Sequence, residues 1–349
     1  MSKSSLATLI IPALAILAMA AMPAGAQAAD DTVKLFVMAG QSNAEGKAKT
    51  DLWDYQAEAP DTKDFFAHFR KDGKWIVRDD VFIKFLGRHG NLTVGYGSPG
   101  CTSSELEFGF ILGDYYQEPV IVIKTAWGGH SLYQKFRSPS AGMPAEDRLE
   151  KELENARKKN PKATMEDIKA QYGISYRNMM SEIKDLQENY ATLFPAMKGK
   201  KLEIAGFYWF QGFNDKFGEY APKEYEQNMK LFIQDVRKDL NVPNLPFVIA
   251  AIGTNMSKEP SGANKEVMDA QLAMNDVPEF KGTVKAFRTD LLVDKKAEAA
   301  YPTWKQNSEE WKKVGSGRPY HYLGSAIWYT RIGKAAGNAM VELLKSQKK

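Results

Sequence analysis

One stretch near the N-terminus constrains the fold most strongly, because an apolar run stops there in a turn of small and polar residues. Residues 33–38 are mostly apolar and β-branched, and the run ends at the sequence GQSN of residues 40–43. A short apolar run bounded by turn residues is typical of a buried strand in a parallel sheet. Ligands bind beyond the carboxyl ends of such strands, so Ser42 stands where a nucleophile would be placed. The alternative is that Ser42 only caps the helix that follows.

Four further apolar runs have the same character. They occupy residues 119–126, 201–210, 246–253 and 282–288. Apolar residues at helical spacing occupy residues 175–192, 222–240, 264–275 and 323–345. Strands that alternate with helices predict a doubly wound α/β fold with a mostly parallel sheet of about five strands. The polar stretch 51–91 is expected to be an excursion from this core, and its Asp-Gly turn at 72–73 predicts a small β-hairpin.

The N-terminal residues 1–28 have the features of a secretory signal peptide. Lys3 supplies a positive charge, residues 6–22 are apolar, and small residues at 24–28 match a signal-cleavage site. Cleavage after Ala28 predicts one mature domain, residues 29–349, that is exported to the periplasm or outside the cell and has no membrane span. A retained membrane anchor is the alternative, because the apolar run is near the lower limit for spanning.

Charge and cysteine content exclude several classes of function. A net charge of +4, from 47 basic and 43 acidic residues, is too mild to indicate a nucleic-acid partner. Cys101 is the only cysteine, so the chain has no internal disulfide. No cluster of histidines and carboxylates has metal-ligand spacing, so we expect neither a metal nor another cofactor. The charged segment at about 143–172 predicts a solvated helical insertion, with a lid or a partner-binding element as the alternative.

A serine nucleophile needs a base, and histidine is the usual one. The chain has four histidines, and only His130 and His321 lie next to elements expected to reach the cleft. His321 is favoured because it stands immediately before the last helix, where doubly wound hydrolases often deliver their base. His130 stays open as the alternative, since sequence position does not fix the members of a triad.

Four short motifs occur in chain order, and together they resemble the SGNH-hydrolase superfamily. They are GQSN at 40–43, KTAWGG at 124–129, WFQGFND at 209–215 and HYLGSA at 321–326. The resemblance is to the branch of sialate O-acetylesterases and carbohydrate esterase family six, and it spans nearly the whole mature chain apart from the charged insertion. It implies a flavodoxin-like three-layer α/β/α sandwich. It also implies a metal-free serine esterase that removes O-acetyl groups from sugars such as sialic acid or plant and algal polysaccharides.

The resemblance further implies roles for individual residues. Ser42 would be the nucleophile, and His321 the general base and then the general acid. The oxyanion hole would combine the Ser42 backbone N–H, a glycine N–H of the Gly128–Gly129 pair, and the side-chain amide of Gln211. Residues within the motifs or next to them are expected to contact the acetylated glycan: Gln41, Asn43, Trp127, His130, Asn214 and Tyr320. Aromatic residues such as Trp127, Trp209 and Tyr320 would either stack on sugar rings or belong to the core.

Two departures from the resemblance leave the orienting acid open. Arg318 stands where many members have an aspartate, three residues before the histidine, and Phe213 stands where some have an acid after Gln-Gly. Asp215 is the candidate acid, with a bare Ser–His pair or a distant acid such as Asp294 or Glu310 as alternatives. The rival functions are an esterase of non-sugar esters and a catalytically idle glycan-binding protein.

Overall fold

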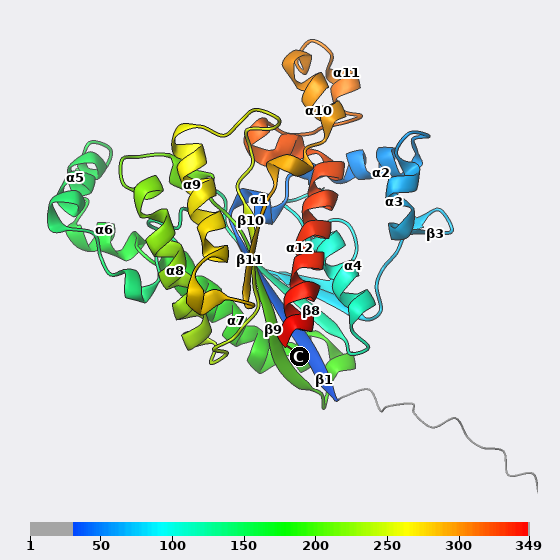
Figure 1. Ribbon diagram of the computed structural model, residues 1–349, viewed down its shortest axis with the longest axis horizontal. Coiled ribbons are helices and arrows are strands. Elements are labelled where there is room, and N and C mark those ends of the chain that lie inside the picture. The colour runs from blue at the N-terminus through cyan, green and yellow to red at the C-terminus, as the bar shows by residue number, and fades with distance from the viewer. Residues whose placement is uncertain (1–30, 348–349) are drawn as a thin grey trace, which may run out of the picture.

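The computed structural model describes residues 31–347, and a seven-stranded sheet lies at its centre (Figure 1). The order of strands across the sheet is β11-β10-β9-β1-β8-β5-β6. All neighbours run parallel except β5 and β6. The strands are β1 (Thr32–Gly40), β5 (Val81–Phe85), β6 (Arg88–Asn91), β8 (Val120–Ala126), β9 (Lys201–Phe210), β10 (Phe247–Ala251) and β11 (Val284–Arg288). The expected signal peptide, residues 1–28, lies outside the described residues.

The central strand β1 is buried on both faces, which explains its continuous apolar run. Its alternate side chains enter two different cores: Phe36 and Met38 join one cluster, whereas Leu35 and Val37 join the other. Gly40 pairs with Ala126 of β8 on one side and with Phe210 of β9 on the other. The three strands therefore end at the same level, and the motifs that follow them meet at one edge of the sheet.

Helices cover both faces of the sheet, so the predicted three-layer α/β/α architecture is confirmed. One face carries α4 (Glu105–Tyr115) and α12 (Ala326–Gln347), which share the first core cluster. The other face carries α7 (Ile174–Leu193), α8 (Ala221–Asp239) and α9 (Gly262–Leu272), which share the second. In Figure 1, α4 and α12 lie to the right of the sheet, whereas α8 and α9 lie to its left.

All five predicted strands are present, but the sheet has two more than expected. The additional strands, β5 and β6, lie within the stretch 51–91 that was interpreted as an excursion from the core. Edge strand β6 has the polar sequence RHGN and is partly exposed, so it carries no apolar pattern. The predicted hairpin is confirmed as β3 (Arg70–Lys71) paired with β4 (Lys74–Trp75).

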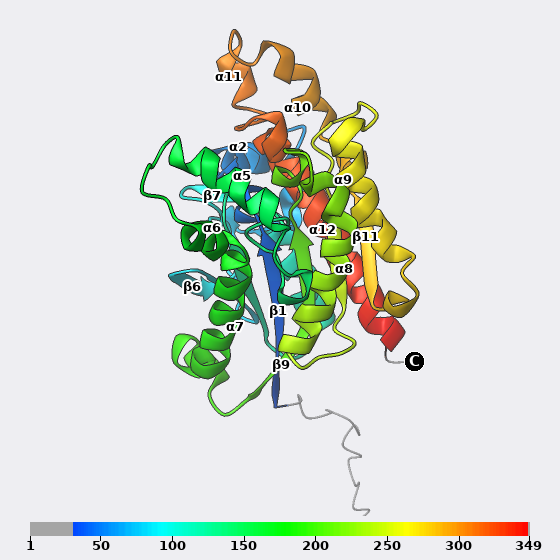
Figure 2. The same cartoon turned by 90° about the vertical axis from the view of Figure 1, so that its left-hand side faces the viewer.

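The charged segment forms two helices, α5 (Glu146–Arg157) and α6 (Met165–Gln171), that project to one side of the molecule (Figure 1). They have a small core of their own, built from Leu149, Leu153, Ala163, Ile168 and Tyr172. The remaining elements are α1 (Ser42–Glu45), α2 (Thr50–Glu58), α3 (Lys63–Phe66), α10 (Lys295–Ala300), α11 (Ser308–Trp311), β2 (Ala48–Lys49) and β7 (Cys101–Thr102). Figure 2 shows α10 and α11 rising above the end of the sheet at which β1 points. Within residues 31–347, no helix has the length and apolar character needed to cross a membrane.

Candidate active site

The turn after β1 places the Ser42 hydroxyl beside an imidazole. Gly40 permits this turn, because a Cβ at that position would lie 2.1 Å from the carbonyl oxygen of Phe210. Ser42 begins α1, and its Oγ lies 3.2 Å from Nε2 of His321. The N-cap of α1 is Gln41, whose side chain makes no capping bond. The Ser42 hydroxyl is therefore paired with a base and does not cap the helix.

His321 reaches Ser42 through an irregular turn before α12. Tyr322 and Leu323 adopt left-handed backbone angles, with φ of 52° and 58°, so the helix expected from residue 323 begins only at Ala326. Burial, together with the positive charge of Lys47, lowers the pKa of His321 to about 4, although the negative charge of Glu45 opposes this shift. The imidazole is therefore neutral at pH 7 and can accept the proton of the serine hydroxyl.

The alternative base, His130, has a different partner. Its Nδ1 lies 2.6 Å from the hydroxyl of Ser175, and its ring stacks against Trp127 with centroids 6.3 Å apart. Burial lowers the pKa of His130, with Lys135 contributing in the same direction. Of the two candidate histidines, the structure pairs His321 with Ser42.

Asn43 ties the turn of the serine to the segment of the histidine. Its amide nitrogen donates to the backbone oxygen of Tyr320 at 3.0 Å, and its amide oxygen accepts from the hydroxyl of Tyr329 at 3.1 Å. That hydroxyl also lies 3.3 Å from the backbone oxygen of His321. Asn43 was expected to contact substrate, but its side chain is buried and bonded within the protein. The geometry favours a positioning role.

Gln41 was also expected to contact substrate, and it too is buried. Its amide nitrogen donates to the side-chain oxygen of Asn214 at 2.8 Å. Its amide oxygen accepts from the side chain of Gln211 at 3.1 Å and from the backbone N–H of Asn214 at 3.2 Å. The side chains of Gln41 and Asn214 therefore hold the turn after β1 against the turn after β9.

Asp215, the candidate triad acid, is 0% exposed and supports a backbone loop. Its carboxylate accepts from the backbone N–H groups of Leu132 and Tyr133, at 2.9 and 2.8 Å, and from the Gln211 amide at 2.6 Å. Burial raises the pKa of Asp215 to about 6, although these donors oppose the shift. The structure shows no hydrogen bond between Asp215 and His321 in the part of the chain it describes.

The two distant acids do not orient the imidazole either. Asp294 caps α10 and accepts from the hydroxyl of Ser325 at 2.6 Å, and Glu310 pairs with Lys313 at 2.7 Å on the surface. Among residues 31–347, no carboxylate is hydrogen-bonded to His321. The site therefore contains a Ser–His pair. Glu45 is the carboxylate whose negative charge raises the pKa of His321.

Glu45 also accepts a hydrogen bond from Gly128, one of the expected oxyanion donors. Its Oε1 accepts from the backbone N–H of Gly128 at 2.5 Å, and its Oε2 pairs with Lys47 at 2.7 Å. Burial raises the pKa of Glu45, but the hydrogen bond and charge of Lys47, with other donors, outweigh it and lower the pKa overall. Gly128 is therefore engaged by a carboxylate that the sequence analysis did not identify.

The other expected oxyanion donors differ in whether they are already hydrogen-bonded within the protein. The Gln211 amide has two protons, and three acceptors surround its nitrogen within 3.1 Å: Gln41, His130 and Asp215. By contrast, the backbone N–H groups of Ser42 and Gly129 make no hydrogen bond to any residue of the described chain. Ser42 and Gly129 are the donors that a developing oxyanion would find free.

A buried ion pair lies next to the nucleophile's helix and was also missed. Lys124 and Glu105 are both 0% exposed, with Nζ and Oε2 3.1 Å apart. The Lys124 ammonium also donates to the backbone oxygen of Glu45 at 2.7 Å, at the end of α1. Burial lowers the pKa of Lys124, and Glu105 opposes this. The available signal was a lysine inside the otherwise apolar run 120–126.

The aromatic residues named from the motifs have different surroundings. Trp209 is fully buried and its ring nitrogen donates to Tyr225, so it belongs to the core. Tyr320 lies beside the imidazole, with ring centroids 4.6 Å apart. Arg318, which replaces the expected aspartate, directs its guanidinium over the Trp304 ring at 5.8 Å from the centroid.

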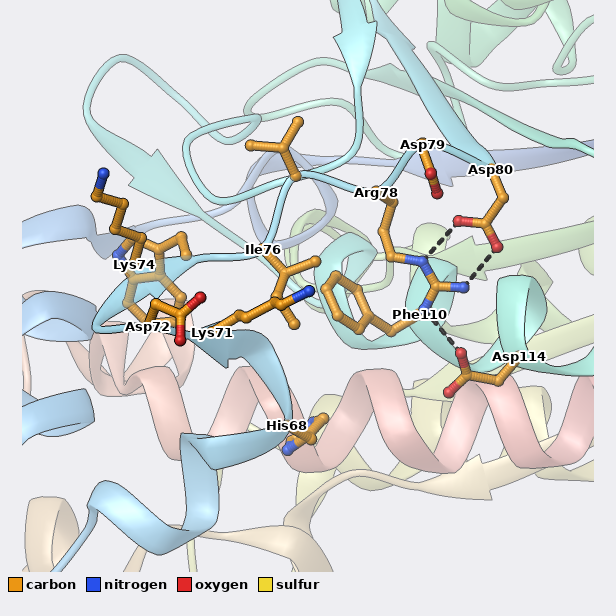
Figure 3. A pocket seen from close by; sticks show the side chains of 12 residues that line it. His68, Lys71, Asp72, Lys74, Ile76, Arg78, Asp79, Asp80, Phe110 and Asp114 are labelled. Carbon is orange, nitrogen blue, oxygen red and sulfur yellow. Dashed lines mark hydrogen bonds and ion pairs between the residues drawn. The ribbon is translucent and has the colours of Figure 1, made fainter.

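A hollow of about 760 Å³ lies away from this site, around the β3–β4 hairpin and α4. Figure 3 shows its charged lining, in which Arg78 is bonded to Asp80 and Asp114. Neither Ser42 nor His321 lines it. Within residues 31–347, no group of three or more histidine, cysteine or acidic side chains is placed to hold a metal ion.

The chain is similar to several known proteins. A curated relative, a probable carbohydrate esterase of Arabidopsis thaliana, is 33% identical over 72 residues, which span 21% of this chain and 26% of the relative. The solved structure of an Arabidopsis thaliana protein is 14% identical, covers 88% of this chain and 97% of its own, and has a TM-score of 0.49. A carbohydrate acetylesterase from Xanthomonas citri is 13% identical over 87% of this chain and 55% of its own, with a TM-score of 0.48.

The family comparison covers most of the chain. The model of the family "Carbohydrate esterase, sialic acid-specific acetylesterase" matches residues 32–299. This range includes Ser42, the Gly128–Gly129 pair and Gln211, and it ends before His321. The chain therefore belongs to the carbohydrate esterase family of sialic acid-specific acetylesterases.

Proposed function

We propose that this protein is an exported serine esterase that removes O-acetyl groups from carbohydrates through an acetyl-enzyme intermediate. The observation that carries the proposal is the distance of 3.2 Å between Ser42 Oγ and His321 Nε2, with an imidazole that burial keeps neutral. Family membership supports the carbohydrate ester as substrate. Export rests on the signal-like character of residues 1–28.

In the first half of the reaction, Ser42 Oγ attacks the acetyl carbonyl carbon while its proton passes to Nε2 of His321. The carbonyl oxygen becomes an oxyanion, and the free N–H groups of Ser42 and Gly129 are the donors that stabilise it. The imidazolium then gives its proton to the sugar oxygen as the bond from that oxygen to the acetyl carbon breaks. The deacetylated sugar leaves, and the acetyl group stays on Ser42.

In the second half, water attacks the acetyl carbon of the intermediate. Neutral His321 takes a proton from this water and then returns it to Ser42 Oγ as acetate leaves. No carboxylate of residues 31–347 is hydrogen-bonded to His321, so Glu45 is the group whose negative charge stabilises the transient imidazolium. The reaction needs no metal and no organic cofactor.

Acetate release from a panel of acetylated glycans and from a small chromogenic acetate ester tests this function. Wild type is compared with Ser42→Ala and with His321→Ala, and His89→Ala serves as the matched histidine control on edge strand β6. We expect release in wild type and in His89→Ala, and none above background in the other two. Glycan binding without release, equal in wild type and Ser42→Ala, would replace the esterase with a binding protein. Release from the chromogenic ester alone would indicate an esterase of non-sugar substrates.

A further inference from the structure

Beside the Ser–His pair lies a surface for which the catalytic mechanism has no use. It consists of Phe213, Phe217 and Tyr320, with the ammonium of Lys216, and we refer to these four residues as the aromatic ledge. Phe213 is central: its ring centroid lies 5.5 Å from that of Phe217 and 5.4 Å from that of Tyr320. Because the Tyr320 ring lies 4.6 Å from the His321 ring, the ledge is continuous with the catalytic base.

The outer end of the ledge is open to solvent. Phe217, which is connected to His321 through the rings of Phe213 and Tyr320, is 59% exposed. Phe213 and Tyr320 are partly exposed, and Tyr320 is held in place through its backbone oxygen, which Asn43 binds. An exposed aromatic surface of fixed geometry suits the apolar face of a pyranose ring.

Lys216 adds a charge to this surface. Its ammonium lies 4.0 Å from the centroid of the Phe213 ring and donates to the Thr254 hydroxyl at 3.4 Å. In the part of the chain that the structure describes, no carboxylate forms an ion pair with Lys216. Burial lowers its pKa, as expected for a cation that lacks a counter-charge. An anionic ligand would supply that charge.

We propose that the aromatic ledge is the subsite for the sugar, and that Lys216 selects acetylated sugars that carry a carboxylate or a sulfate. This inference rests on the proposed esterase function and adds a chemical class of substrate to it. The sugar ring lies on Phe217 and Tyr320, and its anionic group approaches Lys216. The acetyl group then extends toward Ser42, past His321. Phe213, which replaces an expected acid, makes this possible because a carboxylate there would repel the anion.

The test compares two substrates that differ only in charge: a mono-O-acetylated methyl glucoside and the corresponding methyl glucuronide. The chromogenic acetate ester, which lacks a sugar, reports on the catalytic pair alone. We expect Lys216→Gln to raise KM for the glucuronide about fivefold and to leave the other two substrates unchanged. Phe217→Ala should raise KM about threefold for both sugars but not for the chromogenic ester. Lys223→Gln, an exposed lysine of α8, is the matched control.

Equal effects of Lys216→Gln on the neutral and the charged sugar, or no effect on either, would overturn the proposal. A direct binding measurement tests the ledge even if the protein hydrolyses none of these substrates. Calorimetry with methyl glucuronide and the Ser42→Ala protein should show binding that Lys216→Gln weakens by about the same fivefold factor. Binding that follows this pattern without any acetate release would retain the ledge and reject the esterase. Acetate release without charge selectivity would retain the esterase and reject the ledge.

Discussion

Two regions flank Ser42, and they differ in how completely their polar groups are bonded. On the inner side, Gln41, Asn43, Gln211 and Asp215 are buried and bonded to one another or to the backbone. On the outer side, the aromatic ledge exposes Phe217, and no carboxylate in the described part of the chain pairs with Lys216. A region whose bonds are complete fixes geometry, whereas a region with an exposed ring and an unpaired charge is suited to a ligand. The comparison predicts which substitutions affect chemistry, stability or substrate preference.

The largest effect is expected at the Ser42–His321 pair, which lies between the two regions. His321→Ala should lower kcat by about 10⁴-fold or more, because the serine loses its base. The temperature of thermal unfolding should change little, since within residues 31–347 the imidazole is hydrogen-bonded only to Ser42. Initial rates with the chromogenic ester measure the loss, and a decrease of less than tenfold would mean that another group accepts the proton.

The next largest effect should come from the buried ion pair on the inner side. Lys124→Met leaves Glu105 buried and unpaired, so it should lower the free energy of unfolding by about 3–5 kcal/mol. Urea denaturation measures this change. Lys34→Met is the matched control: Lys34 pairs with the half-exposed Glu203, so its loss should cost about 1 kcal/mol or less. The double variant Lys124→Met/Glu105→Leu should regain most of the loss, and failure to do so would assign it to packing.

Glu45 should affect the chemistry through its charge. Glu45→Gln removes the negative charge that raises the pKa of His321, so the acid limb of the profile of kcat/KM against pH should move to lower pH. The less stabilised imidazolium should also lower kcat by roughly tenfold. In wild type, the acid limb is expected near pH 4, well below the ordinary histidine value of 6.5. A lower kcat with an unmoved acid limb would show that Glu45 acts only by holding Gly128.

The smallest effect is expected on the ledge, at the tyrosine next to the histidine. Tyr320→Phe should leave KM and kcat within about twofold, because Asn43 binds the backbone oxygen of Tyr320 and not its hydroxyl. Tyr320→Ala removes the ring and should raise KM for a glycan about threefold. A large loss in Tyr320→Phe would show instead that the hydroxyl takes part in the reaction.

Much of the fold could be predicted because buried parallel strands have a clear pattern. Strands β1, β8, β9, β10 and β11 are apolar runs that end in turn residues, and each was predicted. Strand β6 was missed because half of an edge strand faces solvent and its RHGN sequence has no apolar pattern. The start of α12 was placed too early because the left-handed turn at Tyr322 and Leu323 depends on tertiary contacts, not on local propensity.

The site could be predicted only in part. Ser42 and His321 follow from their positions at the end of a strand and before the last helix, and the structure brings them together. The partner of each carboxylate could not be predicted, because it depends on how separate loops fold against one another. Asp215 ends the motif WFQGFND yet binds Leu132 and Tyr133, whereas Glu45, one turn after Ser42, acts on the imidazole.

The proposed mechanism requires that Ser42 carries the acetyl group during the reaction. Rapid quenching of the wild-type protein with the chromogenic acetate ester, followed by mass spectrometry of its peptides, detects this intermediate. We expect one acetyl group on the peptide that contains Ser42, and none in Ser42→Ala. Acetate release in the wild type without acetylation of Ser42 at any quench time, or undiminished release in Ser42→Ala, would contradict it.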